Sequence, residues 1–271
     1  MSEIKVTYDS HMGDCLKVCR MAKDSYGRTT DWVKQDCGHS DCGPECRGYY
    51  NVLSDKDQRL LKMLARGMGQ SEYEQIQSDI VKASEQADYA EIERLIWKFR
   101  HTTPHLAPFG HNFVTFKFQA PVFVMRQIVK HEYIRISELS MRYVRGMPEY
   151  FRPKSWRAAA DDVKQGSGGD HPNGYIWDDT IQDVYGDDEY LYTTSLESGL
   201  APEQARMFLR LCHVTQGHLS GSMDAIAGLV TKRLDPHAQA ETREFAQQID
   251  KIMADLYPWS WAALTEGVVR D

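Results

Sequence analysis

Apolar side chains that recur every three or four residues predict amphipathic helices along most of this chain. Ser54 is placed to cap one helix, and Asp235-Pro236 suits the cap and first position of the last long one. That last helix carries Phe245, Ile249 and Met253 on one face. The stretches with helical spacing are 13–25, 54–66, 72–99, 122–132, 188–199, 202–214, 219–232 and 236–256.

Two other segments alternate between apolar and polar residues, which is the pattern of a strand. Residues 111–118 carry aromatic and β-branched side chains at alternate positions, and residues 3–8 alternate more weakly. Residues 151–187 are rich in Gly, Asp and Pro without periodicity, which predicts a long loop. Together these patterns predict an α+β fold, mostly helical with a small sheet, and the length of 271 residues allows one large domain or two small ones.

Charge and hydropathy exclude several functional classes. The 271 residues carry a formal net charge of −7, whereas a non-specific grip on nucleic acid needs a basic surface. No apolar run approaches the ~20 residues needed to span a bilayer. The first residues lack the apolar core of a secretory signal, so we expect a cytoplasmic protein. A free nucleotide needs only a few cations at one point, which an acidic protein can still supply.

Three of the six cysteines lie close to a histidine in a Gly- and Pro-containing stretch. Thiolate and imidazole ligands at short spacing are able to hold zinc. The spacing, however, is not that of paired Cys-x-x-Cys motifs, and there is one such cluster only. We therefore interpret residues 30–50 as a surface loop with reduced thiols and expect no metal. The residues concerned are Cys37, His39, Cys42 and Cys46.

The helix predicted over 122–132 carries three polar residues on an otherwise apolar surface. Gln127, Lys130 and His131 are spaced i, i+3, i+4, so they project from one face. Burying them without partners is costly, and we expect them to meet other polar groups or a ligand. The alternative is a solvated basic stripe, which the apolar flanks disfavour. The segment SELSMRY that follows offers hydroxyl, backbone N–H and guanidinium donors suited to a phosphate.

Several separated blocks resemble the flavin-dependent thymidylate synthases. The family signature reads R-H-R, a seven-residue gap and Ser, within a longer pattern QxxRHRxxSxNExSxRY. This chain has Gln127, Lys130-His131-Glu132, Ser137-Glu138-Leu139-Ser140 and Arg142-Tyr143 at those places. Residues 105–111 resemble HxTPxEH, 150–153 resemble F/Y-x-x-P, 205–206 resemble V/A-R, and 233–241 resemble LRxxxxAQxEIR. The blocks extend over residues 100–262, and the resemblance implies a single domain of the family's α+β fold over residues 1–271, with a small antiparallel sheet.

The resemblance implies a site for a pyrimidine nucleoside monophosphate. It places Arg142 and Arg206 at the phosphate, beside the backbone of Ser140 and Met141. It places Arg233 at the pyrimidine, where a cation stabilises the charge that builds as C5 becomes nucleophilic. The implied substrate-binding residues are Gln127, Lys130, Glu138, Ser140, Met141, Arg142, Arg206 and Arg233; the catalytic ones are Arg233 and His131; the cofactor-binding ones are His105, His131, Glu132, Ser137, Ser222, Asp224 and Gly228.

The resemblance also implies a reaction, which is one-carbon transfer from methylenetetrahydrofolate to C5 of dUMP, giving dTMP. In this family reduced FAD supplies the hydride, NADPH is the usual reductant, no cysteine attacks the pyrimidine, and the assembly is a homotetramer. Cys212 is then expected in the core, inside the helix predicted over 202–214, and not as a nucleophile.

The departures from the family pattern fall at its flavin positions. Two residues that are normally Arg are Glu132 and Asp224, and the acidic residue of the HxTPxEH block is Gly110. A carboxylate in place of a guanidinium repels a phosphate. Two further hypotheses therefore stay open: a flavin-independent hydroxymethylase acting on dUMP or dCMP, and a nucleotide-binding protein without catalysis. The sequence does not separate uracil from cytosine.

Overall fold

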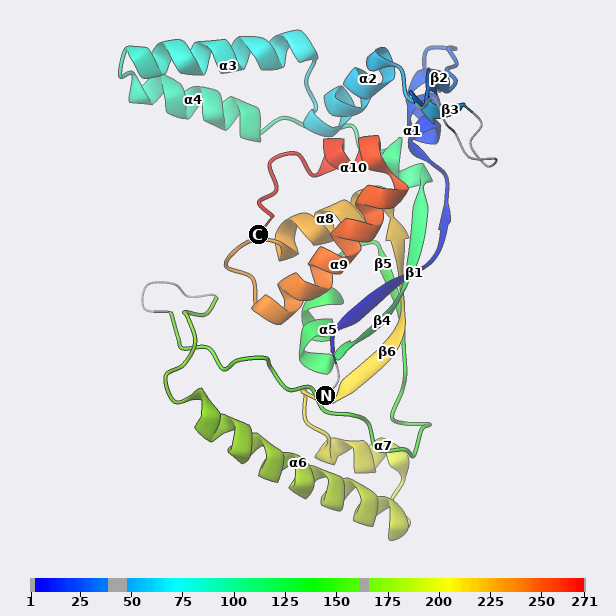
Figure 1. The fold of residues 1–271 in the computed structure, drawn as a ribbon, viewed down its shortest axis with the longest axis vertical. Coiled ribbons are helices and arrows are strands. Elements are labelled where there is room, and N and C mark those ends of the chain that lie inside the picture. The colour runs from blue at the N-terminus through cyan, green and yellow to red at the C-terminus, as the bar shows by residue number, and fades with distance from the viewer. Residues whose placement is uncertain (1–2, 39–47, 161–165, 271) are drawn as a thin grey trace. The chain divides into compact units, whose positions relative to one another are not determined.

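The computed structural model describes residues 3–38, 48–160 and 166–270, which divide into two compact units. Unit 1 combines residues 1–11, 114–252 and 267–271, and unit 2 combines residues 12–113 and 253–266. Each unit is thus built from segments far apart in the sequence (Figure 1). The prediction of one domain over 1–271 stays a prediction, since the placement of the two units relative to one another is not determined.

The sheet of unit 1 has four strands in the order β1-β4-β6-β5. Strand β5 is antiparallel to β6, with Ser137 opposite His218 and Glu138 opposite Gly217. A Cβ atom at Gly217 would lie 2.0 Å from the backbone oxygen of Ser137, so this close approach requires glycine. The strands are β1 (Lys5–Met12), β4 (Phe113–Pro121), β5 (Ile134–Glu138) and β6 (Val214–Ser222).

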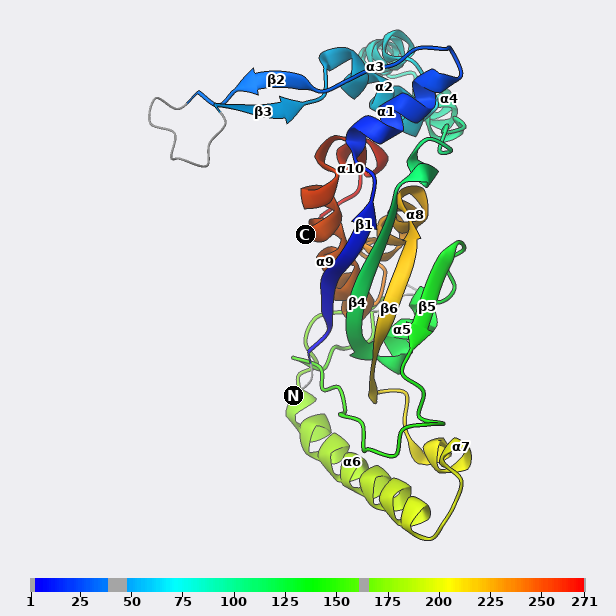
Figure 2. The ribbon, with the colours of Figure 1, turned by 90° about the vertical axis from the view of Figure 1, so that its right-hand side faces the viewer.

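Three helices cover one face of this sheet (Figures 1 and 2). Strand β4 alternates, and its buried members Val114, Phe116 and Phe118 form part of the core. Phe118 meets Phe245 of the last of these helices edge to face, with ring centroids 6.2 Å apart. The helices are α5 (Val122–Ile128), α8 (Met223–Arg233) and α9 (Ala240–Leu256).

A second group of helices in unit 1 packs on the segment that follows β5. Met141, Tyr192 and Ala205 form a small buried cluster there. Asp188 is buried and accepts from Arg210 at 2.9 Å, which ties the long helix to the turn before β6. The elements are α6 (Gly174–Glu197), α7 (Pro202–Ala205) and the 3-10 turn η2 (Arg206–Phe208).

The described residues of unit 2 form helices and one two-stranded ribbon. The Ser54 side chain accepts from the backbone N–H of Asp57, which confirms the predicted cap. The loop predicted over residues 30–50 is wrong at its two ends, where Val33–Asp36 and Tyr49–Val52 pair as antiparallel strands. His39, Cys42 and Cys46 lie outside the described residues, so the interpretation of their thiols and of a metal site is not tested. The elements are α1 (Cys15–Asp24), β2 (Val33–Asp36), β3 (Tyr49–Val52), α2 (Asp55–Arg66), α3 (Gln70–Glu85), α4 (Tyr89–Arg100), η1 (Phe109–His111) and α10 (Pro258–Leu264).

The α+β fold with a small antiparallel sheet is confirmed, but several helix boundaries were wrong. The helix predicted over 122–132 ends at Ile128, because the chain turns and Tyr133 takes a left-handed φ of 61° before β5. Lys130 and His131 therefore lie in a turn and not on a helix face. The stretch 72–99 is two helices, separated at Ala87, whose φ is 52°.

Further differences occur in the second half. The loop predicted over 151–187 is wrong from Gly174 onward, where α6 begins. The helix predicted over 202–214 stops after one turn, so Cys212 lies half-buried in a turn and not inside a helix. Residues 219–222 belong to β6, and α9 begins at Ala240 instead of Pro236. Within the described residues, no helix is both long and apolar enough to cross a bilayer.

Candidate functional site

Unit 1 contains a cavity of about 440 Å³ between α5, the end of β5 and the segment after α7. Four of the predicted substrate-binding residues line it: Glu138, Ser140, Met141 and Arg206. Arg126 and His213 line it as well, although no sequence motif assigned a role to either residue. The remaining lining is apolar and consists of Val122, Leu139, Met207, Leu209 and Leu211.

The backbone at Ser140 is held from both sides. The N–H of Leu139 donates to the carbonyl of Gln216 at 2.8 Å, which continues the pairing of β5 with β6. The carbonyl of Ser140 accepts from Tyr143 at 3.0 Å and closes a turn. Met141, between them, is buried against Tyr192 and Ala205. The cavity wall is therefore fixed by packing and by hydrogen bonds.

The two guanidinium groups in this cavity have no carboxylate partner among the described residues. The Nε of Arg206 donates to the carbonyl of Glu203 at 3.3 Å, and Arg126 on α5 makes no ion pair within the described part of the chain. Both side chains are exposed. Glu138 is the one carboxylate that lines the cavity. Two uncompensated cations beside a Ser hydroxyl suit an anionic ligand.

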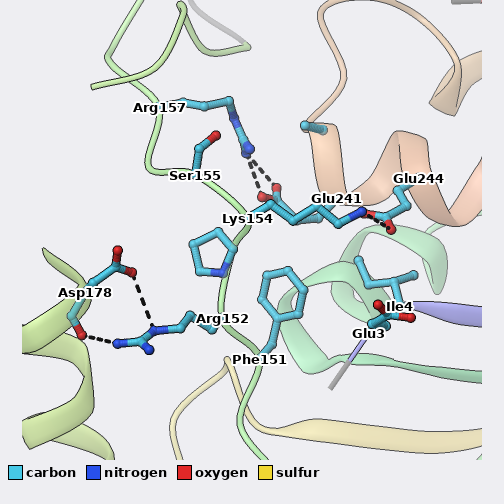
Figure 3. Close-up of a pocket in the computed structure, with 12 residues that line it drawn as sticks. Glu3, Ile4, Phe151, Arg152, Lys154, Ser155, Arg157, Asp178, Glu241 and Glu244 are labelled. Carbon is cyan, nitrogen blue, oxygen red and sulfur yellow. Dashed lines mark hydrogen bonds and ion pairs between the residues drawn. The ribbon is translucent and has the colours of Figure 1, made fainter. Parts of the chain in front are cut away.

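A larger cavity of unit 1, about 530 Å³, has a different electrostatic character (Figure 3). Arg157 forms a two-pronged ion pair with Glu241 at 2.7 and 2.8 Å. Lys154 pairs with Glu244 at 3.3 Å, and Arg152 pairs with a carboxylate of α6. An anion entering here would have to break these pairs. The smaller cavity is therefore the better candidate for a phosphate.

A second polar cluster surrounds Arg233, at the end of α8. Its Nε donates to Nε2 of His131 at 2.9 Å, and an Nη donates to the backbone carbonyl of Gln127 at 2.8 Å. The side chain of Gln127 donates to that of Gln239 at 2.6 Å. Gln127 and His131 thus meet a polar partner, as predicted, whereas Lys130 is exposed and makes no hydrogen bond with the described residues.

The protonation states in this cluster follow from the same contacts. Burial lowers the pKa of His131 to about 4, and the positive charges of Arg233 and Lys232 act in the same direction. Burial also lowers the pKa of Arg233. His131 is therefore neutral at neutral pH, and the bond from Arg233 to Nε2 places its proton on Nδ1.

Comparison with known proteins decides the family. The model of the thymidylate synthase complementing proteins matches residues 51–259 of this chain. The chain belongs to that family.

Relatives in the family are flavin-dependent enzymes by name. The chain is 34% identical over 188 residues to the flavin-dependent thymidylate synthase of Thermus thermophilus, which covers 68% of this chain and 66% of the relative. It is 30% identical over 161 residues to that of Thermosipho africanus, covering 59% of this chain and 71% of the relative. The chain thus spans about two thirds of the length of the Thermus enzyme.

A solved structure confirms the fold of this family member over nearly the whole chain. The UMP/dUMP methylase PolB from Streptomyces cacaoi, bound with 5-Br dUMP, superposes with a TM-score of 0.69. The sequence identity is 21%, and the match covers 97% of this chain and 95% of that one.

The residues predicted to bind the cofactor belong to three different segments of the chain. Ser222 and Asp224 lie at the start of α8, and Oδ1 of Asp224 is buried without a hydrogen-bond partner among the described residues. Gly228 is exposed on the same helix, and Glu132 and Ser137 are exposed before and within β5. His105 belongs to unit 2, where its backbone N–H donates to the carbonyl of Leu64 at 2.8 Å. Arg142 is exposed and does not line the cavity.

The sequence patterns did not identify three residues of the site, which are Arg126, His213 and Gln239. Arg126 follows Val122 by four residues, so the helical register of α5 places both on one face, and this was a usable signal. His213 fell within a predicted helix that does not form, which hid its position. Gln239 belongs to a family block, but only the structure shows its bond to Gln127.

The structure also bears on Cys212. Burial raises the pKa of its thiol above the ordinary value. A thiol is a far weaker nucleophile than a thiolate, so this environment does not activate Cys212.

Proposed function

We propose that this protein transfers a one-carbon unit from methylenetetrahydrofolate to C5 of dUMP and forms dTMP. The observation that carries the proposal is the cavity in which Arg126 and Arg206, both without carboxylate partners among the described residues, face the same space as Ser140. In a chain of net charge −7, such a group of cations suits the dianionic phosphate of a nucleotide. The names of the Thermus and Thermosipho relatives support the reaction.

The cluster around Arg233 suits the pyrimidine end of the substrate. One Nη of Arg233 makes no hydrogen bond with the described residues, while its other nitrogens are held by His131 and Gln127. A guanidinium fixed in this way stabilises negative charge on a ring carbonyl as C5 attacks the methylene carbon. As the bond from C5 to this carbon forms, the bonds that join the carbon to the folate nitrogens break, tetrahydrofolate leaves, and the proton of C5 passes to solvent. Helix α5 carries Arg126 for the phosphate and Gln127 for the base end on adjacent residues.

The residues at the start of α8 fit a flavin in one respect. The buried Oδ1 of Asp224 is an acceptor without a partner among the described residues, and the N3–H edge of an isoalloxazine ring is a donor. Ser222 and Asp224 would hold the ring, whereas His131 lies beside Arg233 at the other end of α8. When bound, reduced FAD supplies the hydride that completes the methyl group, and NADPH is the reductant we propose for it.

We propose a homotetramer as the active assembly. Lys130 and Arg142 are assigned to the substrate by resemblance, yet both are exposed and stand outside the cavity. A second copy of the chain would bring such residues to a shared site. Exposed apolar side chains on α6 and after α7, among them Tyr190, Leu191 and Met207, support self-association.

The proposal is tested by mass spectrometry of the products from dUMP and from dCMP, with methylenetetrahydrofolate present. We expect a methylated product from dUMP that requires both FAD and NADPH. A hydroxymethylated product formed without flavin would replace the proposal with the hydroxymethylase alternative. Nucleotide binding without any product would indicate a protein that has lost catalysis.

A further inference from the structure

His213 lines the phosphate cavity, and neither the sequence blocks nor the proposed reaction gives it a role. Its position is fixed by the backbone. The carbonyl of His213 accepts from Val122 at 3.0 Å, and its N–H donates to the carbonyl of Arg210 at 3.0 Å. The residue also forms an isolated antiparallel bridge with Tyr150. The imidazole is thus carried by a rigid segment between α5 and the start of β6.

The ring has one polar atom to offer to a ligand. Nδ1 lies 2.6 Å from the carbonyl oxygen of Arg210. A carbonyl only accepts, so Nδ1 carries the hydrogen of this bond. Nε2 makes no hydrogen bond with the described residues, and the side chain is half-buried at the cavity wall.

The charges around the ring favour an anion beside Nε2. Arg126 of α5 and Arg206 of η2 line the same cavity, with Glu138 as the carboxylate. The guanidinium of Arg210 is engaged elsewhere, because it pairs with the buried Asp188 at 2.9 Å. Its backbone carbonyl, by contrast, accepts a hydrogen bond from Nδ1 of the imidazole.

We propose that His213 is a substrate-binding residue whose Nε2, protonated in the complex, donates a hydrogen bond to the phosphate of the nucleotide. This rests on the proposed function, which places a nucleoside monophosphate in the cavity. The proton comes from solvent on binding, and no bond of the substrate is made or broken. His213 thereby adds a third donor side chain to those of Arg126 and Arg206.

Two substitutions of His213 distinguish the role of Nε2 from that of Nδ1. The amide nitrogen of His213→Asn takes the place of Nδ1 and keeps the bond to Arg210, but nothing replaces Nε2. The longer His213→Gln places an amide donor near Nε2 and gives up the bond to Arg210. Calorimetric titration with dUMP should show about tenfold weaker binding for His213→Asn and a loss below about threefold for His213→Gln. Binding of deoxyuridine, which lacks the phosphate, should be unchanged in both.

Calorimetric titration in two buffers of different ionisation enthalpy independently measures the number of protons taken up when dUMP binds. At pH 8 the nucleotide phosphate is already a dianion, so proton uptake reports on the protein. We expect uptake with the wild type and less with His213→Asn. Unaltered dUMP affinity and uptake in His213→Asn would overturn the proposal, as would equal weakening by both variants when their melting temperatures match the wild type. A wild type that binds no dUMP would instead refute the proposed function.

Discussion

At residue scale, the bond between Arg233 and His131 makes the two side chains dependent on each other. Arg233 needs an acceptor on Nε2, which a protonated imidazole cannot provide. His131 in turn keeps its neutral form because it is partly buried beside that cation. The pair thus holds the guanidinium in one orientation and leaves an Nη for the substrate.

This arrangement predicts a pH dependence of stability. The folded pKa of His131 is about 4, below the ordinary value of 6.5, so between these values the unfolded chain binds more protons. The folded state should therefore lose stability as pH falls from 6.5 to 4, by about 1–2 kcal/mol after allowance for solvent screening. Urea denaturation at several pH values measures this loss. In His131→Asn the free energy of unfolding should no longer show this loss between pH 6.5 and 4. An unchanged pH dependence in the variant would contradict the assignment of the loss to His131.

The unpaired cations give a second prediction. Arg206→Gln should weaken dUMP binding about tenfold or more, because it removes a charged donor from the phosphate cavity. Lys154→Gln is the matched control, since Lys154 lies in the larger cavity and is paired with Glu244. Fluorescence or calorimetric titration gives both affinities. Equal effects of the two variants would mean that the smaller cavity is not the phosphate site.

Cys212 provides a third prediction at this scale. Because burial raises the pKa of its thiol, Cys212→Ala should retain dTMP formation to within about threefold. The assay is turnover under the conditions that support the wild type. A loss of more than about a hundredfold in a folded Cys212→Ala variant would point to covalent catalysis by this cysteine.

At the scale of elements, the path of β5 determines the geometry of the cavity. The strand leads directly into Leu139 and Ser140, and its pairing with β6 depends on the absence of a side chain at Gly217. If β5 moved away from β6, Leu139 and Ser140 in the cavity wall would move with it. Stability and substrate binding are therefore coupled through one glycine.

Gly217→Ala is the fourth prediction. We expect a loss of about 1–3 kcal/mol in the free energy of unfolding, since the new methyl group would collide with the backbone of Ser137. Gly186→Ala, in the exposed middle of α6 where nothing lies within 4 Å of a new Cβ, should instead gain about 0.5–1 kcal/mol. Chemical denaturation compares the two. A neutral Gly217→Ala would show that the strands separate at little cost.

The elements that the sequence predicted well are those whose signals are local. Ser54 caps α2 through its own side chain, and the alternation of residues 111–118 reports the buried face of β4. The segment 219–222 was misassigned because β6 is rich in Gly, Ser and His and is held as a strand by its pairing with β5. Helix α6 was placed too late because few of its residues are buried, so its apolar pattern is weak.

In the candidate site, too, local sequence signals identified some residues, and tertiary structure alone places others. Motif blocks identified Glu138, Ser140, Met141 and Arg206, which the fold brings to one cavity. His213 joins them from a bridge with Tyr150 that no periodicity reveals, whereas the helical register of α5 could have indicated Arg126. Lys130 does not share a helix face with Gln127, as the i, i+3 spacing predicted, because α5 ends at Ile128.

At the scale of the whole molecule, the proposed tetramer gives a fifth prediction. Light scattering coupled to size exclusion should give about four times the chain mass of 31.1 kDa. Leu191→Asp, on the exposed surface of α6, should shift the population to smaller species and reduce turnover together. Val81→Asp, exposed on α3 of unit 2, is the control. A monomer with full activity would refute the proposal of a shared site.

Helix α10 has a consequence for synthesis on the ribosome. It belongs to unit 2, where Trp261 is buried and the N–H of Ser260 donates to Sγ of Cys15 at 3.4 Å. The partners of this helix, α1 and α2, leave the exit tunnel some two hundred residues earlier. Until α10 has been synthesised, the apolar surface of α1 and α2 that α10 covers is exposed to solvent. We therefore expect a nascent chain stalled before residue 253 to bind chaperones through this exposed surface of unit 2, even though residues 12–113 of the unit are already synthesised.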